Sequence, residues 1–174
     1  GTPGDRFSEI CGGDITGKPT VVLWGDSHAA SLYRGFLKQS HKLNFNLAQY
    51  TTSGCPPVVG FEMDNRPECK WLNNDVLEKI KATKPDTVVL SAYWLLYDGK
   101  HSFRKGEPWN YMPKERLVNT ISILKSIGIK NVVVIGQLPT FHLSQIKVGA
   151  KHFVAGEKNR TFSAYVIKSI AMDR

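Results

Sequence analysis

Hydrophobic positions along the chain follow two alternating patterns: short continuous apolar runs, and longer segments with apolar residues at helical spacing. The short runs predict strands at 21–24, 44–50, 87–94 and 131–136. Helical spacing, bounded by Pro or Gly, predicts helices over 29–37, 70–83, 113–127 and 156–174. This alternation predicts a three-layer α/β/α domain with a parallel central sheet. Residues 95–112 are expected to form a long surface loop.

The first predicted strand ends at a short polar turn, Gly25-Asp26-Ser27-His28. Because a helix follows at once, this turn lies at the carboxyl end of a strand, where open α/β sheets place their ligand crevices. Two interpretations of the turn remain open at this point. Asp26 or Ser27 can simply cap the helix, as such residues often do, or Ser27 can be an exposed nucleophile.

The composition is that of a globular domain. The chain has 174 residues, of which 41% are hydrophobic, enough for one domain with its own core. No apolar run approaches the roughly 18 residues of a membrane span, and no signal peptide is visible. The first residue is Gly and not Met, so we expect the chain to be a piece of a longer protein.

A net charge of +8 is compatible with an anionic partner such as nucleic acid, a glycan or a membrane face. The basic residues are dispersed along the chain, however, and no nucleic-acid-binding module is recognisable. We therefore expect no nucleic acid partner. No metal and no cofactor are expected either, because the three cysteines lack the closely spaced pairs of a zinc site.

The cysteines leave two possibilities open. Cys55 lies in a Pro-rich turn, and Cys69 lies at the start of a predicted helix. In an oxidising compartment a bridge between them would close the loop and contribute on the order of 3 kcal/mol. In a reducing compartment they would be two buried free thiols. Cys11 has no partner within this chain under the first interpretation.

Several segments in order resemble the SGNH, or GDSL-like, hydrolases. Gly25-Asp26-Ser27 after the first hydrophobic strand is similar to the nucleophile block of that family. The longer string Val22–Ala29 is most similar to the extracytoplasmic SGNH domain fused to bacterial family 3 membrane acyltransferases, which O-acetylate lipopolysaccharide O-antigen and related glycans. The other matching segments are Gly54-Cys55-Pro56-Pro57, Cys69 followed by Asn73, Pro85–Leu90 leading to Trp94, and Val133–Gly136 followed by Leu138-Pro139.

The resemblance implies a role for each matching residue. Ser27 would be the nucleophile, and Gly25 and Asp26 would shape its turn. The main-chain N–H groups of Ser27 and Gly54 would form the oxyanion hole. Where the family ordinarily has an asparagine donor, this sequence has Ser91-Ala92-Tyr93-Trp94. The acyltransferase-linked members share the tryptophan, so Trp94 is expected to support the site, and the third oxyanion donor stays unassigned.

The family's base comes from an Asp-x-x-His block near the C-terminus, and no such block stands in this chain. We therefore expect residues 1–18 to be an extension or linker and residues 19–174 to be an SGNH-like domain truncated before that block. The base and its orienting acid are expected beyond Arg174. The chain's own histidines are weak candidates by position: His28, His41, His101, His142 and His152.

The resemblance predicts an enzyme of the O-acyltransferase or esterase type, acting through a serine acyl-enzyme on a cell-envelope glycan. It implies a glycan acceptor and a membrane acyltransferase domain in the same polypeptide that supplies the acetyl group. The expected location is the periplasm, or another extracytoplasmic site next to the inner membrane. As presented, without its base, the chain is expected to be inactive. A carbohydrate acetyl esterase and a glycan-binding module without catalysis are the alternatives.

Overall fold

A central parallel sheet organises the chain in the computed structural model, which describes residues 17–100 and 111–138. Within these ranges the sheet has the strand order β2-β1-β3-β4, and every neighbouring pair is parallel. The strands are β1 (Thr20–Gly25), β2 (Asn46–Thr51), β3 (Thr87–Ser91) and β4 (Asn131–Ile135). The prediction that the first, third and fourth strands are parallel neighbours is confirmed.

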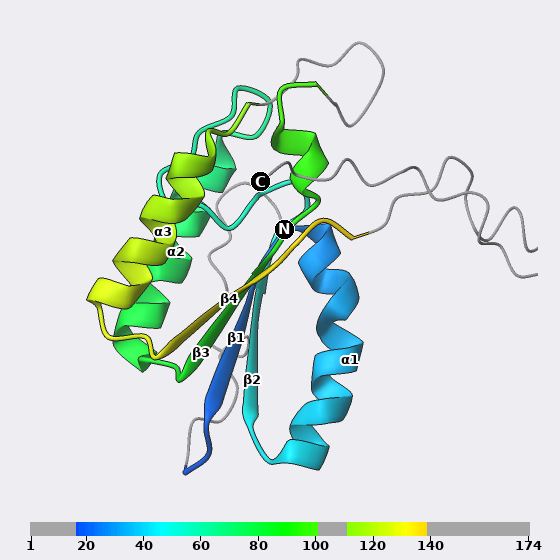
Figure 1. Cartoon of the computed structure of the whole chain (residues 1–174), viewed down its shortest axis with the longest axis vertical. Helices are drawn as coiled ribbons and strands as arrows, with labels where there is room; N and C mark the ends of the chain where they lie inside the picture. Colours follow the sequence, from blue (N-terminus) through cyan, green and yellow to red (C-terminus); the bar gives the residue numbers. More distant parts are fainter. Residues whose placement is uncertain (1–16, 101–110, 139–174) are drawn as a thin grey trace, which may run out of the picture. The chain divides into compact units, whose positions relative to one another are not determined.

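Helices cover both faces of this sheet, as Figure 1 shows. One face carries α1 (Ser27–Leu43), and the other carries α2 (Glu68–Thr83) and α3 (Lys114–Ser126). The predicted three-layer α/β/α arrangement is therefore confirmed. The predicted helix over 156–174 lies outside the described residues, as do Cys11, His101, His142 and His152.

Strand side chains alternate between the two faces, as the period of two in a strand requires. Val22 and Trp24 of β1 pack into the core beneath α2 and α3. Leu23, one residue out of phase with them, packs with Ala29 of α1 and Val89 of β3 on the opposite face. Since both faces of β1 and β3 are covered, their sequences are continuous apolar runs rather than alternating ones.

The segment predicted as a surface loop over 95–112 is partly buried, which corrects that prediction. Residues Trp94–Tyr97 form a short 3-10 helix, η2. Leu96 and Tyr97 are buried in a third hydrophobic cluster together with Met112 and the loop that follows β2. Leu96 and Tyr97 are buried by contacts with segments distant in the chain, while residues 101–110 lie outside the described ranges.

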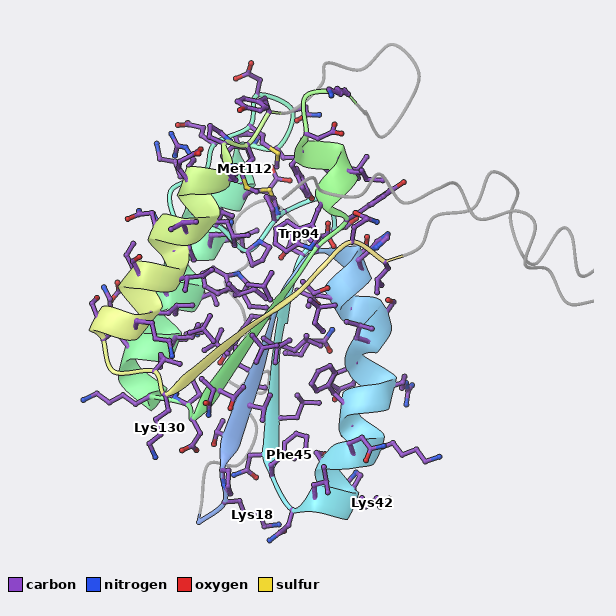
Figure 2. All side chains as sticks on the ribbon, viewed as in Figure 1. Lys18, Lys42, Phe45, Trp94, Met112 and Lys130 are labelled. Carbon is purple, nitrogen blue, oxygen red and sulfur yellow. A yellow bond between two sulfur atoms is a disulfide. The ribbon has the colours of Figure 1, made fainter. Side chains whose placement is uncertain are left out.

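Lysines gather at the end of the sheet where the strands begin. Figure 2 shows Lys18, Lys42 and Lys130 at this end and Trp94 and Met112 at the other. The last turns of α1, α2 and α3 each carry basic residues, among them Lys42. Cations are stabilised at helix C-termini by the helix dipole, which accounts for the basic residues in these last turns.

Asp86 joins two segments at that same end of the sheet, between α2 and β3. Its carboxylate accepts a hydrogen bond from the Thr20 N–H at 3.0 Å and lies 3.3 Å from Lys130 Nζ. The hydrogen bond from Thr20, aided by Lys130, holds the pKa of Asp86 below its ordinary value of 3.8. A lowered pKa in the folded state means that the charged carboxylate stabilises the fold.

We therefore expect Asp86→Asn to lower the free energy of unfolding at neutral pH, with a penalty that disappears in acid. The stabilisation is fully present above the unfolded-state pKa and is lost as pH falls through the lower, folded-state pKa. Urea unfolding of both proteins between pH 7 and pH 2.5 measures this difference. A penalty that stays constant across the range would contradict the charge-based explanation.

Candidate active site

Ser27 is the first residue of α1 and lies at the carboxyl edge of the sheet, directly after β1. Its side chain is exposed, whereas Gly25 and Asp26 before it are buried. The N–H groups in the first turn of a helix have no carbonyl partner within that helix, and the helix dipole places positive charge there. This position therefore presents a serine hydroxyl to solvent beside N–H donors suited to a negatively charged oxygen.

Gly25 allows β1 and β3 to approach closely just before the serine. A Cβ atom on Gly25 would overlap the main-chain carbonyl oxygen of Ser91 in β3 and would come within 2.9 Å of the Ala29 Cβ. Only a residue without a side chain fits between these two neighbours. The predicted supporting role of Gly25 thus has a direct steric basis.

Asp26 connects the serine turn to the segment after β3. Its side chain is 1% exposed, with Oδ1 accepting from the His28 N–H at 2.8 Å. Oδ2 accepts from the Tyr93 N–H and from the Tyr97 hydroxyl, both at 2.9 Å. Asp26 is therefore the N-cap of α1, which leaves the Ser27 side chain out of the capping interaction.

Tyr97 is a hydrogen-bond donor to this carboxylate from the buried 3-10 helix. Burial, together with the adjacent Asp26 carboxylate, raises the pKa of the Tyr97 hydroxyl above its usual value. The phenol therefore stays protonated at physiological pH and keeps donating to Asp26. This contact holds η2 against the beginning of α1.

The His28 side chain packs beside the serine, on Tyr93. The two rings are stacked, with centroids 4.4 Å apart and an interplanar angle of 10°. The His28 Nδ1 atom is buried and has no hydrogen-bond partner among the residues that the structure describes. Packed in this way, the His28 ring is held against Tyr93.

The loop that carries Gly54 starts beside the serine turn. In the sheet register Gly25 pairs with Thr51, and the Thr52 N–H donates to the Gly25 carbonyl at 3.0 Å. Gly54 has a φ of 71°, a left-handed conformation that favours glycine. The two segments predicted to form an oxyanion hole therefore leave neighbouring strands at the same edge of the sheet.

Cys55 and Cys69 are joined in a disulfide, with their Cα atoms 5.2 Å apart. Both residues are buried in the third hydrophobic cluster. The sequence left open a disulfide or two buried free thiols, and the structure contains the disulfide. It connects the residue after Gly54 to the first turn of α2.

We expect Cys55→Ser/Cys69→Ser to lower the free energy of unfolding by about 3 kcal/mol, because the bridge restricts the unfolded loop. Urea unfolding measures that change. Alkylation of the present chain without prior reduction, followed by mass spectrometry, should modify Cys11 alone. Three alkylated cysteines in protein prepared under oxidising conditions would contradict the bridge and the extracytoplasmic setting.

Trp94 ties the segment after β3 to the end of β4. Its indole Nε1–H donates to the Ile135 carbonyl at 2.7 Å. Because the indole has only this one N–H, it is occupied and does not supply the third oxyanion donor. Figure 2 shows Trp94 near the carboxyl end of the sheet, and its supporting role in the site stays a prediction.

Sequence reasoning missed Tyr97 and the long-range contacts that hold these turns together. Tyr97 contacts Asp26 across 71 positions of the chain, and Trp24 contacts Asn73 across 49. Neither pair leaves a periodic or local signal. The apolar string that contains Tyr97 and the polar Asn73 on the buried side of α2 were the available hints.

Fold and site together define the class: a three-layer α/β domain with an exposed serine on its first strand-to-helix turn. The family model for the SGNH domain (fused to AT3 domains) matches residues 2–170. The chain therefore belongs to this family of SGNH domains, as the sequence resemblance predicted.

A solved structure, the periplasmic domain of a lipopolysaccharide acetyltransferase from Salmonella ser. Paratyphi A, has a similar fold. It superposes with a TM-score of 0.66 over 88% of this chain, at 22% sequence identity. The present chain spans 59% of the length of that domain. No match to a curated protein was found. Among the described helices, none is long and apolar enough to cross a membrane.

Proposed function

We propose that the chain is the extracytoplasmic catalytic domain of a membrane acyltransferase that O-acetylates a cell-envelope glycan, with lipopolysaccharide O-antigen as the expected acceptor. The observation that carries this proposal is the exposed Ser27, which follows a buried Asp26 whose two carboxylate oxygens both accept hydrogen bonds. Membership of a family fused to AT3 domains supports a membrane domain in the same polypeptide as the acetyl source.

The first half of the reaction forms an acyl-enzyme. Ser27 Oγ attacks the carbonyl carbon of the donor acetyl group while a histidine accepts the hydroxyl proton. The negative charge that develops on the carbonyl oxygen is stabilised by the main-chain N–H groups of Ser27 and Gly54. The donor's leaving group then departs with the proton held by the histidine, and the acetyl group is left on Ser27.

The second half transfers the acetyl group to the glycan. A sugar hydroxyl attacks the acetyl carbon, the histidine takes the hydroxyl proton, and Ser27 Oγ leaves and regains a proton. If water takes the place of the sugar, the same steps make an acetyl esterase. Exclusion of water from the acyl-enzyme is therefore what separates the two activities.

The base is assigned to an Asp-x-x-His block expected beyond Arg174, since neither histidine in the described ranges suits the role. His28 is stacked on Tyr93 with its Nδ1 buried. His41 lies in the last turn of α1, at the opposite end of that helix from Ser27. The Asp of the block is expected to orient the His, as in other triads.

The proposal is tested by expressing the whole protein, and its Ser27→Ala variant, in a bacterium whose surface glycan lacks O-acetyl groups. NMR of the purified glycan is expected to show new O-acetyl signals with the natural protein and none with Ser27→Ala. Loss of existing O-acetyl groups from an acetylated glycan would indicate an esterase instead. Glycan binding with no change in acetylation by either protein would indicate a binding module and overturn the proposal.

A further inference from the structure

Asn73 is a buried amide that bonds to two separate segments of the site. It lies on α2 and its side chain is 3% exposed. Its Nδ2 donates to the Pro56 carbonyl at 2.8 Å and to the Val58 carbonyl at 3.1 Å. Its Oδ1 accepts from the Trp24 indole Nε1–H at 2.9 Å. Every side-chain hydrogen bond of this residue is therefore made to a segment that leads to the proposed active site.

The two carbonyls belong to the loop that carries Gly54. Pro56 follows Gly54 by two residues, and the disulfide of Cys55 to Cys69 holds the intervening position. Cys69 and Asn73 are four residues apart on α2, so they lie on the same face of that helix. One helix face thus holds the loop by a covalent bond and by two hydrogen bonds.

The third hydrogen bond connects the same amide to β1, the strand that leads into the serine turn. Trp24 is the residue before Gly25 in β1, is 1% exposed and packs in the core beneath α2. An indole N–H can only donate, so it selects the orientation in which the Asn73 oxygen faces Trp24 and the NH2 group faces the loop. Trp24 therefore orients Asn73, and Asn73 orients the loop.

We infer that Asn73 is a positioning residue, which places the Gly54 main-chain N–H relative to Ser27. This inference rests on the proposed function, because it assigns Gly54 to the oxyanion hole. An amide is required chemically, since one side chain must accept from an indole and donate twice to carbonyls. A carboxylate cannot donate, and a leucine of similar size can do neither.

The test is Asn73→Leu, with Thr120→Val as the matched control. Thr120 is also buried and bonds to the same loop, but farther along, where its Oγ1 accepts from the Val59 N–H at 3.1 Å. Both substitutions are close in shape to the natural residue and remove buried hydrogen bonds. Thermal unfolding of both variants shows how much stability each has lost, and all assays are run well below the lower melting temperature.

The first readout is hydrogen exchange of the peptide covering residues 52–58 in the present chain. Asn73→Leu is expected to speed exchange there selectively, and Thr120→Val to leave the Gly54 end of the loop protected. The second readout is turnover of an activated acetyl ester by a longer chain that continues through the expected Asp-x-x-His block. There Asn73→Leu should lower kcat about 100-fold with little change in KM, the scale of a lost or misplaced oxyanion donor, and Thr120→Val should lower kcat less than about threefold.

The outcomes separate this inference from the proposed function. Unchanged exchange at residues 52–58 in Asn73→Leu overturns the positioning role, whether or not the longer chain is active. Equal losses of kcat in Asn73→Leu and Thr120→Val, in proportion to lost stability, also overturn it. If instead exchange increases as expected but turnover by the longer chain does not depend on Ser27, the proposed function fails and the assignment of Gly54 to an oxyanion hole fails with it.

Discussion

Replacing Ser27 with alanine is expected to lower the turnover of an activated acetyl ester by about 10⁶-fold in a chain that includes the Asp-x-x-His block. Without the Ser27 hydroxyl the site cannot form an acyl-enzyme, and loss of the nucleophile of a triad costs on that order. In the present chain, which ends at Arg174, natural protein and Ser27→Ala should hydrolyse the ester at nearly equal rates, because a serine without a base is a weak nucleophile.

The longer and the shorter chain test separate parts of this prediction. Ser27→Ala in the longer chain tests the nucleophile, and the shorter chain tests the proposal that the base lies beyond Arg174. Robust hydrolysis by the shorter chain that depends on Ser27 would contradict the assignment of the base beyond Arg174. Single alanine substitutions at His101 and His142 would then identify which histidine serves.

Replacing Gly25 with alanine is expected to lower the free energy of unfolding by about 3 kcal/mol or more. The added Cβ would overlap the Ser91 carbonyl oxygen, so the central strands β1 and β3 would have to separate where they pair. Forced overpacking of a buried site costs on this scale. Urea unfolding, with the slope compared between proteins, measures the loss.

Gly35→Ala provides the matched control for this substitution. Gly35 lies within α1, and a Cβ there would meet nothing within 4 Å. Alanine is favoured over glycine in a helix interior by about 0.5–1 kcal/mol, so Gly35→Ala should stabilise the protein. Equal stability of Gly25→Ala and the natural protein would show that β1 and β3 do not approach each other as closely as described.

Much of the fold follows from local patterns in the sequence. The apolar runs at β1 and β3 are continuous because both faces are covered, and the helix after residue 113 begins with Pro and ends before Gly128. These signals depend only on neighbouring residues. The η2 segment differs from the predicted loop because its burial depends on contacts with Asp26 and with the third hydrophobic cluster, which are distant in sequence.

The candidate site likewise combines residues in local sequence motifs with contacts between distant parts of the chain. Ser27 and Gly54 are proposed as site residues because each stands in a short motif that resembles a block of the family. The framework around them could not be recognised in this way, since the hydrogen bonds of Asp26 to Tyr97 and of Asn73 to Trp24 exist only once the sheet has formed. Asn73 was visible as part of the resemblance, but nothing in its surroundings indicated that its amide holds the Gly54 loop.

If Ser27 carries the acetyl group during the reaction, the acetylated serine can be trapped and detected. The longer chain is mixed with an activated acetyl ester, quenched in acid during turnover, digested and analysed by peptide mass spectrometry. We expect an acetyl group on Ser27 that disappears on further incubation with an acceptor and is absent from Ser27→Ala. Turnover with no acetyl on Ser27, or equal turnover by Ser27→Ala, would contradict this role of Ser27.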